Sequence, residues 1–233
     1  LLSRDDVEAN VEGVRAQLAR FLDFSGPRGA TLVNNADWLG PMPFLDFLRD
    51  TGKHFTINVM LARESVRQRI EDREHGMSFT EFSYILLQSY DFLHLFDHYD
   101  CRLQIGGSDQ WGNITAGTTF VRKVTGATVH GVVYPLITRA DGTKFGKTES
   151  GTIWLDAKKT SPYAFYQFWL NTADADVYQF LRFFTFLSPA EIADIETQDK
   201  AGTGKPQAQR ILAEQVTAIV HGQSAVDAAV RIS

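Results

Sequence analysis

Apolar residues at helical spacing predict a helix at the start of the chain. Ser3 and Asp6 form a capping-box pattern. They precede a row of apolar positions that would share one helix face: Val7, Val11, Val14, Leu18 and Phe21. An amphipathic helix at a terminus needs a surface to cover, so we expect that the beginning of the fold lies outside this sequence.

The next segments are short, and each is assigned from its own local pattern. The apolar and turn-forming residues predict a strand at 31–34, a helix at 43–50 that stops at Gly52, and a helix at 64–72. The stretch 54–62 fits a strand as well as a helix. This part of the chain therefore predicts mixed α and β structure without fixing its topology.

A longer helix and a crossover unit are predicted in the middle of the chain. Ser78 and Glu81 form a second capping box, which opens a helix running to about His94. A strand at 102–105, a glycine-rich turn, a helix at 111–125 and a strand at 132–137 follow in that order. A strand–helix–strand order is typical of two parallel strands joined by a crossover helix.

Beyond residue 156 the pattern becomes helical. Ser161-Pro162 and Ser188-Pro189 each place a cap before a first-turn proline, and Glu191 completes a capping box. The stretch 201–204 is typical of a linker, and a helix from 207 to 221 stops at Gly222. We predict an α/β fold with two domains, a nucleotide-binding domain within 1–156 and an α-helical domain at 157–233.

Composition and charge narrow the class of protein. Hydrophobic residues make up 44% of the 233 positions and charged residues 22%, which is ordinary for a globular protein. No apolar run approaches the ~20 residues of a membrane helix, and no signal-peptide pattern is present. The single cysteine, Cys101, fits a reducing compartment, so we expect a cytoplasmic protein. The net charge of −5 gives no general electrostatic reason to bind nucleic acid.

Three polar residues lie on one face of the predicted helix that begins after Ser78. Tyr84, Gln88 and Asp91 follow one another at i, i+4 and i+7. Their neighbours are so apolar that little of the helix can face water, and a buried carboxylate or amide is costly without a hydrogen bond. Either these groups satisfy one another within the protein, or they line a pocket for a polar ligand.

The run 103–113, Leu-Gln-Ile-Gly-Gly-Ser-Asp-Gln-Trp-Gly-Asn, is the most distinctive in the chain. Two glycines at the carboxyl end of a parallel strand let the backbone approach a ligand closely, at the edge where α/β sheets bind ligands. Asp109 can accept hydrogen bonds from ribose hydroxyls, and the start of the next helix attracts an anion. The alternative is a tight turn in which Gly-Gly only relieves crowding.

The segment 140–151 combines three glycines with Lys144, Lys147 and small hydroxyl residues. Such a loop can bring two ammonium groups onto a phosphate chain. It is not a Walker A loop, because three residues instead of four separate Gly142 from Gly146 and the following residues look extended. A solvated turn with two incidental lysines is the alternative.

Taken together, these motifs resemble the bacterial-type tyrosyl-tRNA synthetases, class I enzymes with a Rossmann-type catalytic domain. Residues 144–148, Lys-Phe-Gly-Lys-Thr, match that family's version of the Lys-Met-Ser-Lys-Ser loop. Residues 79–91 and 104–113 match two further family motifs. The similarity extends over essentially the whole chain, including 34–38 and 161–163.

The resemblance implies roles for the motif residues. Tyr84 and Gln88 would hold the amino group of tyrosine, and Asp91 would accept the phenol hydroxyl. Further amino-acid contacts would come from Gln104, Gln110 and, at the edge of the pocket, Asn35. Tryptophanyl-tRNA synthetases share the architecture, but nothing in that likeness explains this Tyr-Gln-Asp row.

The resemblance also implies how ATP would be held. Asp109 and the Gly106-Gly107 backbone would bind the adenosine ribose. Lys144, Lys147 and Thr148 would stabilise the pyrophosphate leaving group while the tyrosine carboxylate attacks the α-phosphorus. Lys147 would also bind the nucleotide. Mg²⁺ would accompany ATP, and we assign no protein-bound metal. The remaining partners implied are tRNA(Tyr) and a second copy of the chain, with Phe79 and 47–55 in the homodimer contact.

Two family features are missing from the sequence. The His-Ile-Gly-His motif and the carboxy-terminal anticodon-binding domain have no counterpart in it, so we expect an incomplete catalytic core that is inactive alone. The alternative hypothesis is a non-catalytic fragment or paralogue that serves as a dimerisation or RNA-binding module. Four arginines could touch an acceptor stem, but interspersed glutamates favour a solvated helix face: Arg63, Arg67, Arg69 and Arg73.

Overall fold

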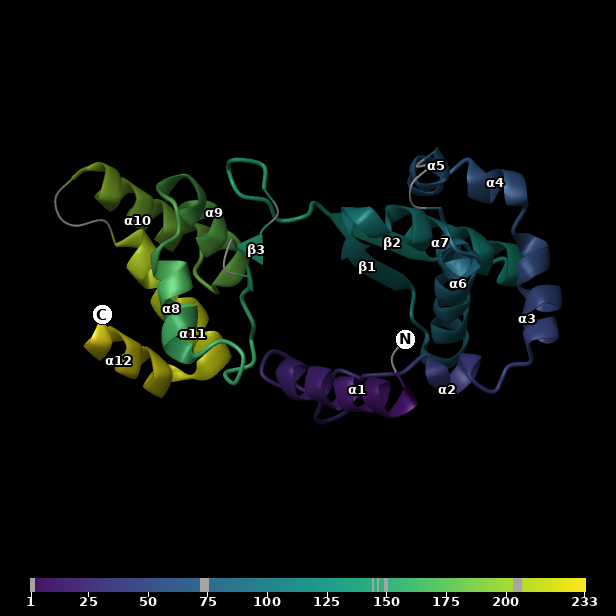
Figure 1. Cartoon of the computed structure of the whole chain (residues 1–233), viewed down its shortest axis with the longest axis horizontal. Helices are drawn as coiled ribbons and strands as arrows, with labels where there is room; N and C mark the ends of the chain where they lie inside the picture. The colour runs from purple at the N-terminus through teal and green to yellow at the C-terminus, as the bar shows by residue number, and fades with distance from the viewer. Residues whose placement is uncertain (1–2, 72–75, 144, 146, 149–150, 203–206) are drawn as a thin grey trace. The chain divides into compact units, whose positions relative to one another are not determined.

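The computed structural model describes residues 3–71, 76–143, 145, 147–148, 151–202 and 207–233. They form two compact units: a central unit at 33–136, and a helical unit that combines 1–32 with 137–233 (Figure 1). The predicted domain boundary at 156/157 divides the chain differently from these units and stays a prediction.

The central unit is built on a β–α–β crossover. Strand β1 (Leu103–Gly107) pairs with β2 (His130–Tyr134) in parallel, with Leu103 opposite His130 and Gly107 opposite Tyr134. Helix α7 (Trp111–Thr125) connects them and ends at Gly126, whose φ of 77° is left-handed. The predicted crossover is confirmed, and with it the parallel pairing of the strands.

The alternation of side chains gives the two strands a covered face and an open face. Gly106 and Gly131 lie on the covered face, because a Cβ added to either would meet the Ile114 side chain of α7. Ile105 and Val132 lie opposite each other on the other face, and they are 61% and 49% exposed. Helix α7 therefore shields one side of the sheet only.

Helix α6 (Phe79–Tyr99) packs against α7 and is the longest helix among the described residues. Its capping box is formed as predicted, since the Glu81 backbone N–H donates to Ser78 Oγ and the Ser78 backbone N–H donates to the Glu81 carboxylate. The helix continues past the predicted end at His94 to Tyr99, where Asp100 turns left-handed with a φ of 50°. This length gives α6 an inner face that can carry both core and site residues.

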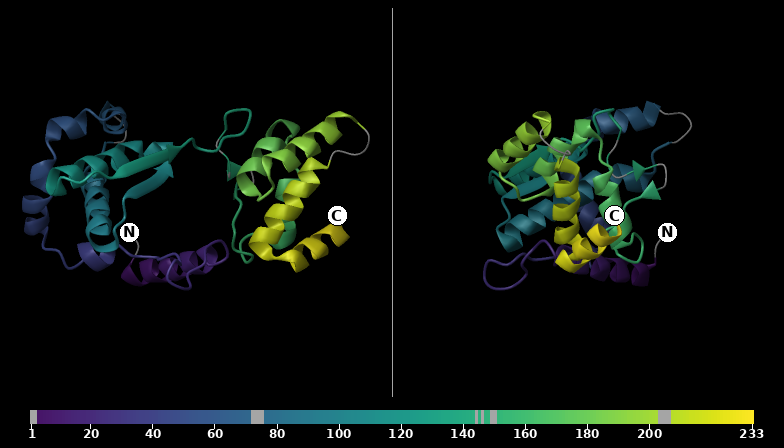
Figure 2. Two further views of the ribbon diagram at one scale, coloured as in Figure 1. Left: turned by 180° about the vertical axis from the view of Figure 1, so that it is seen from behind. Right: turned by 90° about the vertical axis from the view of Figure 1, so that its left-hand side faces the viewer.

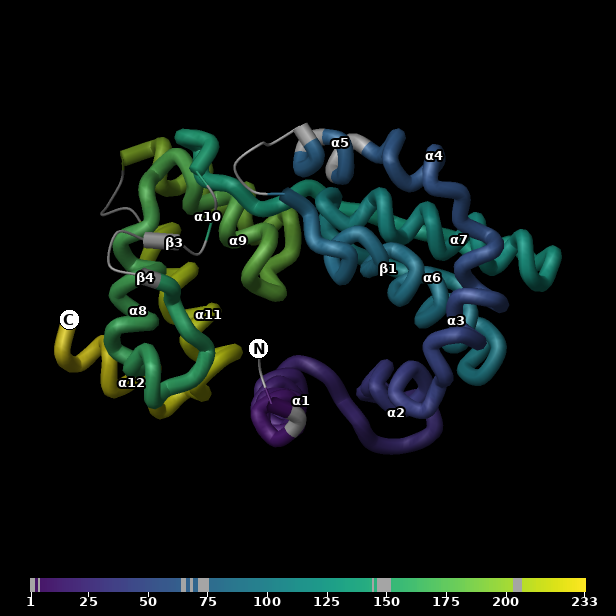
Figure 3. Tube along the Cα trace, turned by 45° about the vertical axis from the view of Figure 1, so that its right-hand side comes forward, coloured from purple at the N-terminus to yellow at the C-terminus, as the bar shows by residue number. Residues whose placement is uncertain are grey.

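Short helices follow one another around the α6–α7 pair (Figure 3). They are α2 (Ala36–Leu39), α3 (Phe44–Asp50), η1 (Gly52–His54), α4 (Ile57–Leu61) and α5 (Glu64–Glu71). The ambiguous stretch 54–62 thus contains the end of η1 and the whole of α4, and none of it is strand. The strand predicted at 31–34 is wrong: a strand needs a neighbour to share its hydrogen bonds, and in the described part of the chain these residues pair with none.

The helical unit contains α1 (Arg4–Leu18), α8 (Pro162–Leu170), α9 (Asp174–Phe184), α10 (Pro189–Lys200), α11 (Ala208–His221) and α12 (Gln223–Ile232). Helices α8, α11 and α12 lie side by side in both views of Figure 2. The short strands β3 (Lys147–Thr148) and β4 (Gly151–Thr152) pair antiparallel. None of the helices within the described residues has both the length and the apolar character needed to cross a bilayer.

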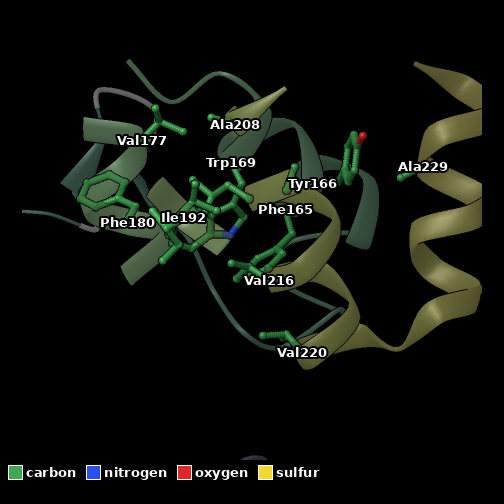
Figure 4. Close-up of a cluster of buried hydrophobic side chains, with 13 residues drawn as sticks. Phe165, Tyr166, Trp169, Val177, Phe180, Ile192, Ala208, Val216, Val220 and Ala229 are labelled. Carbon is green, nitrogen blue, oxygen red and sulfur yellow. The ribbon is translucent and has the colours of Figure 1, made fainter. Parts of the chain in front are cut away.

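An aromatic core holds the helical unit together (Figure 4). Phe165, Trp169 and Phe180 are at most 4% exposed, and Leu181 and Leu212 are fully buried. Burying side chains of this size contributes about 1.5–3 kcal/mol each. The predicted caps of α8 and α10 are formed at Ser161 and Ser188, so the chain enters each helix at a defined position.

Candidate functional site

The predicted polar row lies on one face of α6, as its spacing requires. Tyr84 is 54% exposed, whereas Gln88 and Asp91 are half-buried among apolar neighbours. The row therefore begins at the solvent-exposed Tyr84 and continues to the half-buried Gln88 and Asp91. Its three members have different surroundings, which decide what each can bind.

Asp91 is held by two donors from the segment around α2. Trp38 Nε1 donates to Asp91 Oδ1 at 2.8 Å, and Asn35 Nδ2 donates to Asp91 Oδ2 at 3.1 Å. These contacts fix the carboxylate from both sides. A carboxylate oxygen accepts more than one hydrogen bond, so each oxygen retains capacity for a ligand hydroxyl.

The Trp38 ring is itself packed in a stack. It lies against His94 with ring centroids 4.3 Å apart, and His94 stacks on His98 at 4.1 Å. Burial lowers the pKa of His94 and the neighbouring His98 lowers it further, although Asp91 and Asp97 act in the opposite direction. A neutral imidazole is thus favoured behind the indole ring. Trp38 has no role that the sequence predicts, because a contact across 53 positions leaves no local signal.

Two of the predicted glutamines carry buried oxygens without a hydrogen-bond partner. The Oε1 atoms of Gln88 and Gln104 are shielded from solvent and accept no hydrogen bond within the described structure. A buried acceptor left unsatisfied costs about 1–3 kcal/mol. Both side chains are therefore suited to receive a hydrogen-bond donor, such as an ammonium group.

The glycine-rich turn after β1 brings the backbone close to Asp109. A Cβ added to Gly107 would lie 2.6 Å from Asp109 Oδ1 and 3.1 Å from a Leu136 methyl group, so a larger residue there would displace these side chains. Asp109 lies exposed in the 3-10 turn η2 (Ser108–Gln110), directly before α7. The turn thus presents a carboxylate and a glycine backbone at the carboxyl end of a parallel strand, where α/β sheets bind ligands.

A short network orients the amides beside this turn. Gln110 Nε2 donates to Asp109 Oδ2 at 3.2 Å, and Asn113 Nδ2 donates to Gln110 Oε1 at 3.0 Å. The chain of donors leaves Gln110 with a defined orientation. It also places a polar surface at the start of α7, where the helix macrodipole favours negative charge.

A cavity of about 500 Å³ brings three of the predicted residues together. Tyr84, Asp109 and Gln110 line it, together with Thr80 of α6 and Arg63. Asn35, Gln88, Asp91 and Gln104 do not line this cavity. The predicted set therefore falls into one group around the cavity and one group around the inner part of α6.

Arg63 is half-buried in the cavity wall rather than fully solvated. Its guanidinium donates through Nη1 to the carbonyl of Gly112, and burial lowers its pKa. Arg69 pairs with Glu81 at 3.1 Å on the exposed side. Arg63 thus faces the same cavity as Tyr84 and Asp109, and the ion pair of Arg69 and Glu81 lines that cavity too.

The described residues include only part of the lysine loop, 144–148. Lys144 is outside them altogether, and Lys147 and Thr148 are described in backbone only, as strand β3. Their side chains, and hence their predicted contacts with phosphate, are not described. The roles assigned to Lys144, Lys147 and Thr148 stay predictions.

Comparisons with known proteins agree over the whole chain. Residues 1–233 match the family model for "tRNA synthetases class I (W and Y)". The chain is 62% identical over 229 residues to the tyrosine–tRNA ligase of Chromobacterium violaceum, covering 98% of this chain and 54% of that protein. It is 60% identical over 233 residues to the tyrosine–tRNA ligase of Dechloromonas aromatica, covering 100% of this chain and 55% of that protein. The chain spans about half the length of the curated relatives it matches.

A solved structure shows the same fold. The C-terminally truncated mitochondrial tyrosyl-tRNA synthetase of Aspergillus nidulans matches 99% of this chain with a TM-score of 0.82 and 31% identity, and 68% of that chain is covered. The likeness confirms the predicted Rossmann-type α/β fold, of which the parallel β1–β2 pair is the described part.

Proposed function

This chain belongs to the class I tRNA synthetases (W and Y), and from that premise we propose that it is part of a tyrosine–tRNA ligase. Such an enzyme joins the tyrosine carboxylate to the α-phosphorus of ATP, releases pyrophosphate, and passes the tyrosyl group from the adenylate to tRNA(Tyr). Curated relatives with 62% and 60% identity carry the name tyrosine–tRNA ligase. The choice of tyrosine over tryptophan rests on the polar row of α6.

The observation that carries the proposal is the setting of Asp91. Its carboxylate is fixed by Trp38 and Asn35 and keeps capacity for one more donor. A phenol hydroxyl is such a donor, and a site that offers a buried acceptor to it rejects an analogue without the hydroxyl, because the acceptor is then left unpaired. We therefore assign Asp91 to the tyrosine hydroxyl and Asn35 to its support.

The amino group of tyrosine would be held by acceptors on α6 and on β1. Gln88 and Gln104 have buried Oε1 atoms that need a donor, and an ammonium group supplies three. Tyr84 and Gln110 line the neighbouring cavity and would complete the contacts with the amino acid. This assignment is supported by hydrogen-bond capacity.

The adenosine would lie against the turn after β1. Gly106 and Gly107 let the backbone approach closely, and the exposed Asp109 carboxylate can accept both ribose hydroxyls. We assign Lys144, Lys147 and Thr148 to the pyrophosphate leaving group on the match of 144–148 to the family loop. Contacts of this kind accelerate the reaction when they form only in the transition state.

Mg²⁺ would reach the site on the ATP phosphates. Within the described residues no cluster of three His, Cys, Asp or Glu side chains is arranged to hold a metal ion. Magnesium commonly keeps several waters and binds through substrate phosphates, so this donor set fits a metal that arrives with its nucleotide. Bound there, it would neutralise charge that develops on the phosphates.

A homodimer is the assembly that we propose for the full protein. Exposed apolar side chains gather on the short helices α3 and α4, among them Phe44, Leu45, Ile57 and Val59, each at least 57% exposed. Exposed apolar patches of this kind mark protein interfaces. We also place the full protein in the cytoplasm, where Cys101, the single cysteine of this sequence, would stay reduced.

Pyrophosphate exchange tests the proposal directly. The full-length gene product should exchange pyrophosphate into ATP with tyrosine and only weakly with phenylalanine. Asp91→Ala should lose the preference for tyrosine, whereas Asp97→Ala, an exposed aspartate of the same helix, should keep it. A full-length protein without tyrosine-dependent exchange would instead support the alternative, a non-catalytic module for dimerisation or RNA binding.

A further inference from the structure

A small hairpin begins at Ile137 and reaches Phe145, which belongs to the lysine loop. The described residues 137–143 and Phe145 form it, with Arg139 N donating to Thr143 O at 2.9 Å and Phe145 N donating to Ile137 O at 3.2 Å. Gly142 closes the turn by donating to Arg139 O at 2.9 Å, with a φ of 81° that favours glycine. The hairpin is thus a defined element whose last residue, Phe145, lies directly after Lys144 in the sequence.

An aromatic cage holds the end of this hairpin on the helical unit. The Phe145 ring lies 4.8 Å from Phe180, 5.1 Å from Phe184, 5.6 Å from Trp169 and 6.0 Å from Phe168, measured between ring centroids. Edge and tilted contacts at these distances are favourable for aromatic rings. Phe145 is therefore anchored in the core formed by α8 and α9.

A buried carboxylate holds the turn of the same hairpin. Asp176 is 4% exposed, and its Oδ1 accepts the backbone N–H of Ala140 at 2.6 Å. The residue lies in the first turn of α9, where the helix macrodipole favours a negative charge. A buried carboxylate is costly without a hydrogen bond, and this contact joins it to the hairpin rather than to its own helix.

We infer that Asp176 is a positioning residue that, together with the cage around Phe145, fixes the backbone from which the two lysines of 144–148 emerge. The inference rests on the proposed function, because it assigns those lysines to the pyrophosphate of ATP. Asp176 touches neither substrate nor reacting atoms in this assignment. It acts through the Ala140 amide, so its loss should weaken stabilisation of the leaving group and leave tyrosine binding intact.

Ala140→Pro tests the contact with little disturbance of the hairpin. Ala140 is the second residue of the turn closed by Gly142, a position where proline is favoured. The substitution removes the N–H that Asp176 accepts and leaves the helices unchanged. Asp176→Leu removes the acceptor, and Asp176→Asn keeps an oxygen that can accept the same bond. Asp174→Asn is the matched control, an exposed aspartate in the same helical turn.

Exchange kinetics of the full-length product form the first readout. Ala140→Pro and Asp176→Leu should lower kcat by roughly 10- to 100-fold, since small displacements of a positioned group have effects of that order. The KM for tyrosine should stay unchanged, Asp176→Asn should retain most activity, and Asp174→Asn should match the wild type. The double variant should lose no more than the worse single variant, because both changes break one contact.

Trypsin cleavage of the present chain is the second readout, and it needs no activity. Cleavage after Lys144 or Lys147 should become several-fold faster in Ala140→Pro and Asp176→Leu, relative to cleavage elsewhere. Equal cleavage and equal kcat in all variants would overturn the inference. If the wild type shows no tyrosine-dependent exchange, the proposed function fails, while faster cleavage would still support the anchoring contact and unchanged cleavage would refute it.

Discussion

The indole N–H of Trp38 donates to the carboxylate of Asp91 at 2.8 Å, which joins α2 to the middle of α6 across 53 positions of sequence. Asn35, three residues before Trp38, binds the other carboxylate oxygen. One short segment thus controls the orientation of the group that we assign to the tyrosine hydroxyl. With Asp91 assigned to the tyrosine hydroxyl as we propose, amino-acid selection would depend on residues that need not touch the substrate.

Trp38→Phe should weaken tyrosine recognition. The change keeps an aromatic ring against His94 but removes the donor to Asp91. A hydrogen bond to a charged group contributes about 1.5–3 kcal/mol, so we expect the KM for tyrosine to rise roughly tenfold or more. Pyrophosphate-exchange kinetics of the full-length product would measure this KM, with Trp154→Phe in the helical unit as the control. An unchanged KM would show that Asn35 alone orients the carboxylate.

Gly107→Ala should impair nucleotide binding more than amino-acid binding. The added Cβ would lie 2.6 Å from Asp109 Oδ1, so the carboxylate must move from its place in the turn. We expect the KM for ATP to rise by about tenfold, the effect of losing one hydrogen bond to a charged group, with little change in the KM for tyrosine. Equal changes in both constants would instead indicate a general disturbance of the turn.

Stability of the helical unit should fall in mild acid. Burial, and then the nearby Arg20, lower the pKa of His221 below its usual value. The unfolded chain binds a proton near pH 6.5, whereas the folded chain does so only at lower pH, so the unfolded state holds more protons in between. The free energy of unfolding should therefore decrease as pH drops through 6.5, and stop decreasing below the folded pKa.

Urea denaturation at pH 7.5 and 5.5 would measure this effect. His221→Leu should reduce the difference between the two pH values, while the exposed His130→Gln should leave it unchanged. His94, whose pKa is also lowered by burial, should account for part of the remainder. If the free energy of unfolding of His221→Leu differed between the two pH values as much as that of the wild type, the effect could not be assigned to His221.

Arg20→Ala should raise the pKa of His221. Arg20 Nη1 donates to the carbonyl of Val220 at 2.7 Å, in the last turn of α11, and its charge opposes a proton on the adjacent imidazole. Removing the guanidinium should also destabilise the helix end by about 1 kcal/mol. An NMR titration of the histidine signals would report the pKa. A shift in the downward direction would contradict this electrostatic account.

Two glycine substitutions should have opposite effects on stability. Gly131→Ala would place a Cβ 2.3 Å from Ile114 Cγ2, where α7 approaches β2, and overpacking of this kind costs about 1–3 kcal/mol. Gly13→Ala has open space within 4 Å in the middle of α1 and should stabilise by about 0.5–1 kcal/mol. Thermal unfolding of the two variants would show whether the space around each glycine decides if the substitution raises or lowers stability.

Local signals in the sequence predicted the elements that begin with their own caps. Ser3, Ser78 and Ser188 each open a helix through a capping box, and the structure contains all three. Helices α9 and α12 were not predicted individually, and the residues before them, Ala173 and Gly222, provide no capping side chain to mark where they begin. The wrong strand at 31–34 depended on a partner that no local pattern specifies.

The candidate site shows the same limit of sequence reasoning. Helical spacing alone predicted that Tyr84, Gln88 and Asp91 share a face of α6, and the resemblance supplied their roles. The donors around Asp91 and the link from Asp176 to Ala140 are contacts between distant segments. Such contacts are set by packing of the whole unit, so neither spacing nor composition contains them.

The open face of the β1–β2 pair has a practical consequence for work with this chain. Ile105 and Val132 are neighbours on the sheet and are exposed to solvent. Within the described residues, each of the two strands pairs with only one other strand. Unprotected strand edges beside apolar side chains are templates for pairing between molecules. Concentrated preparations should therefore self-associate and lose monomer over time, and a light-scattering check should precede any binding titration.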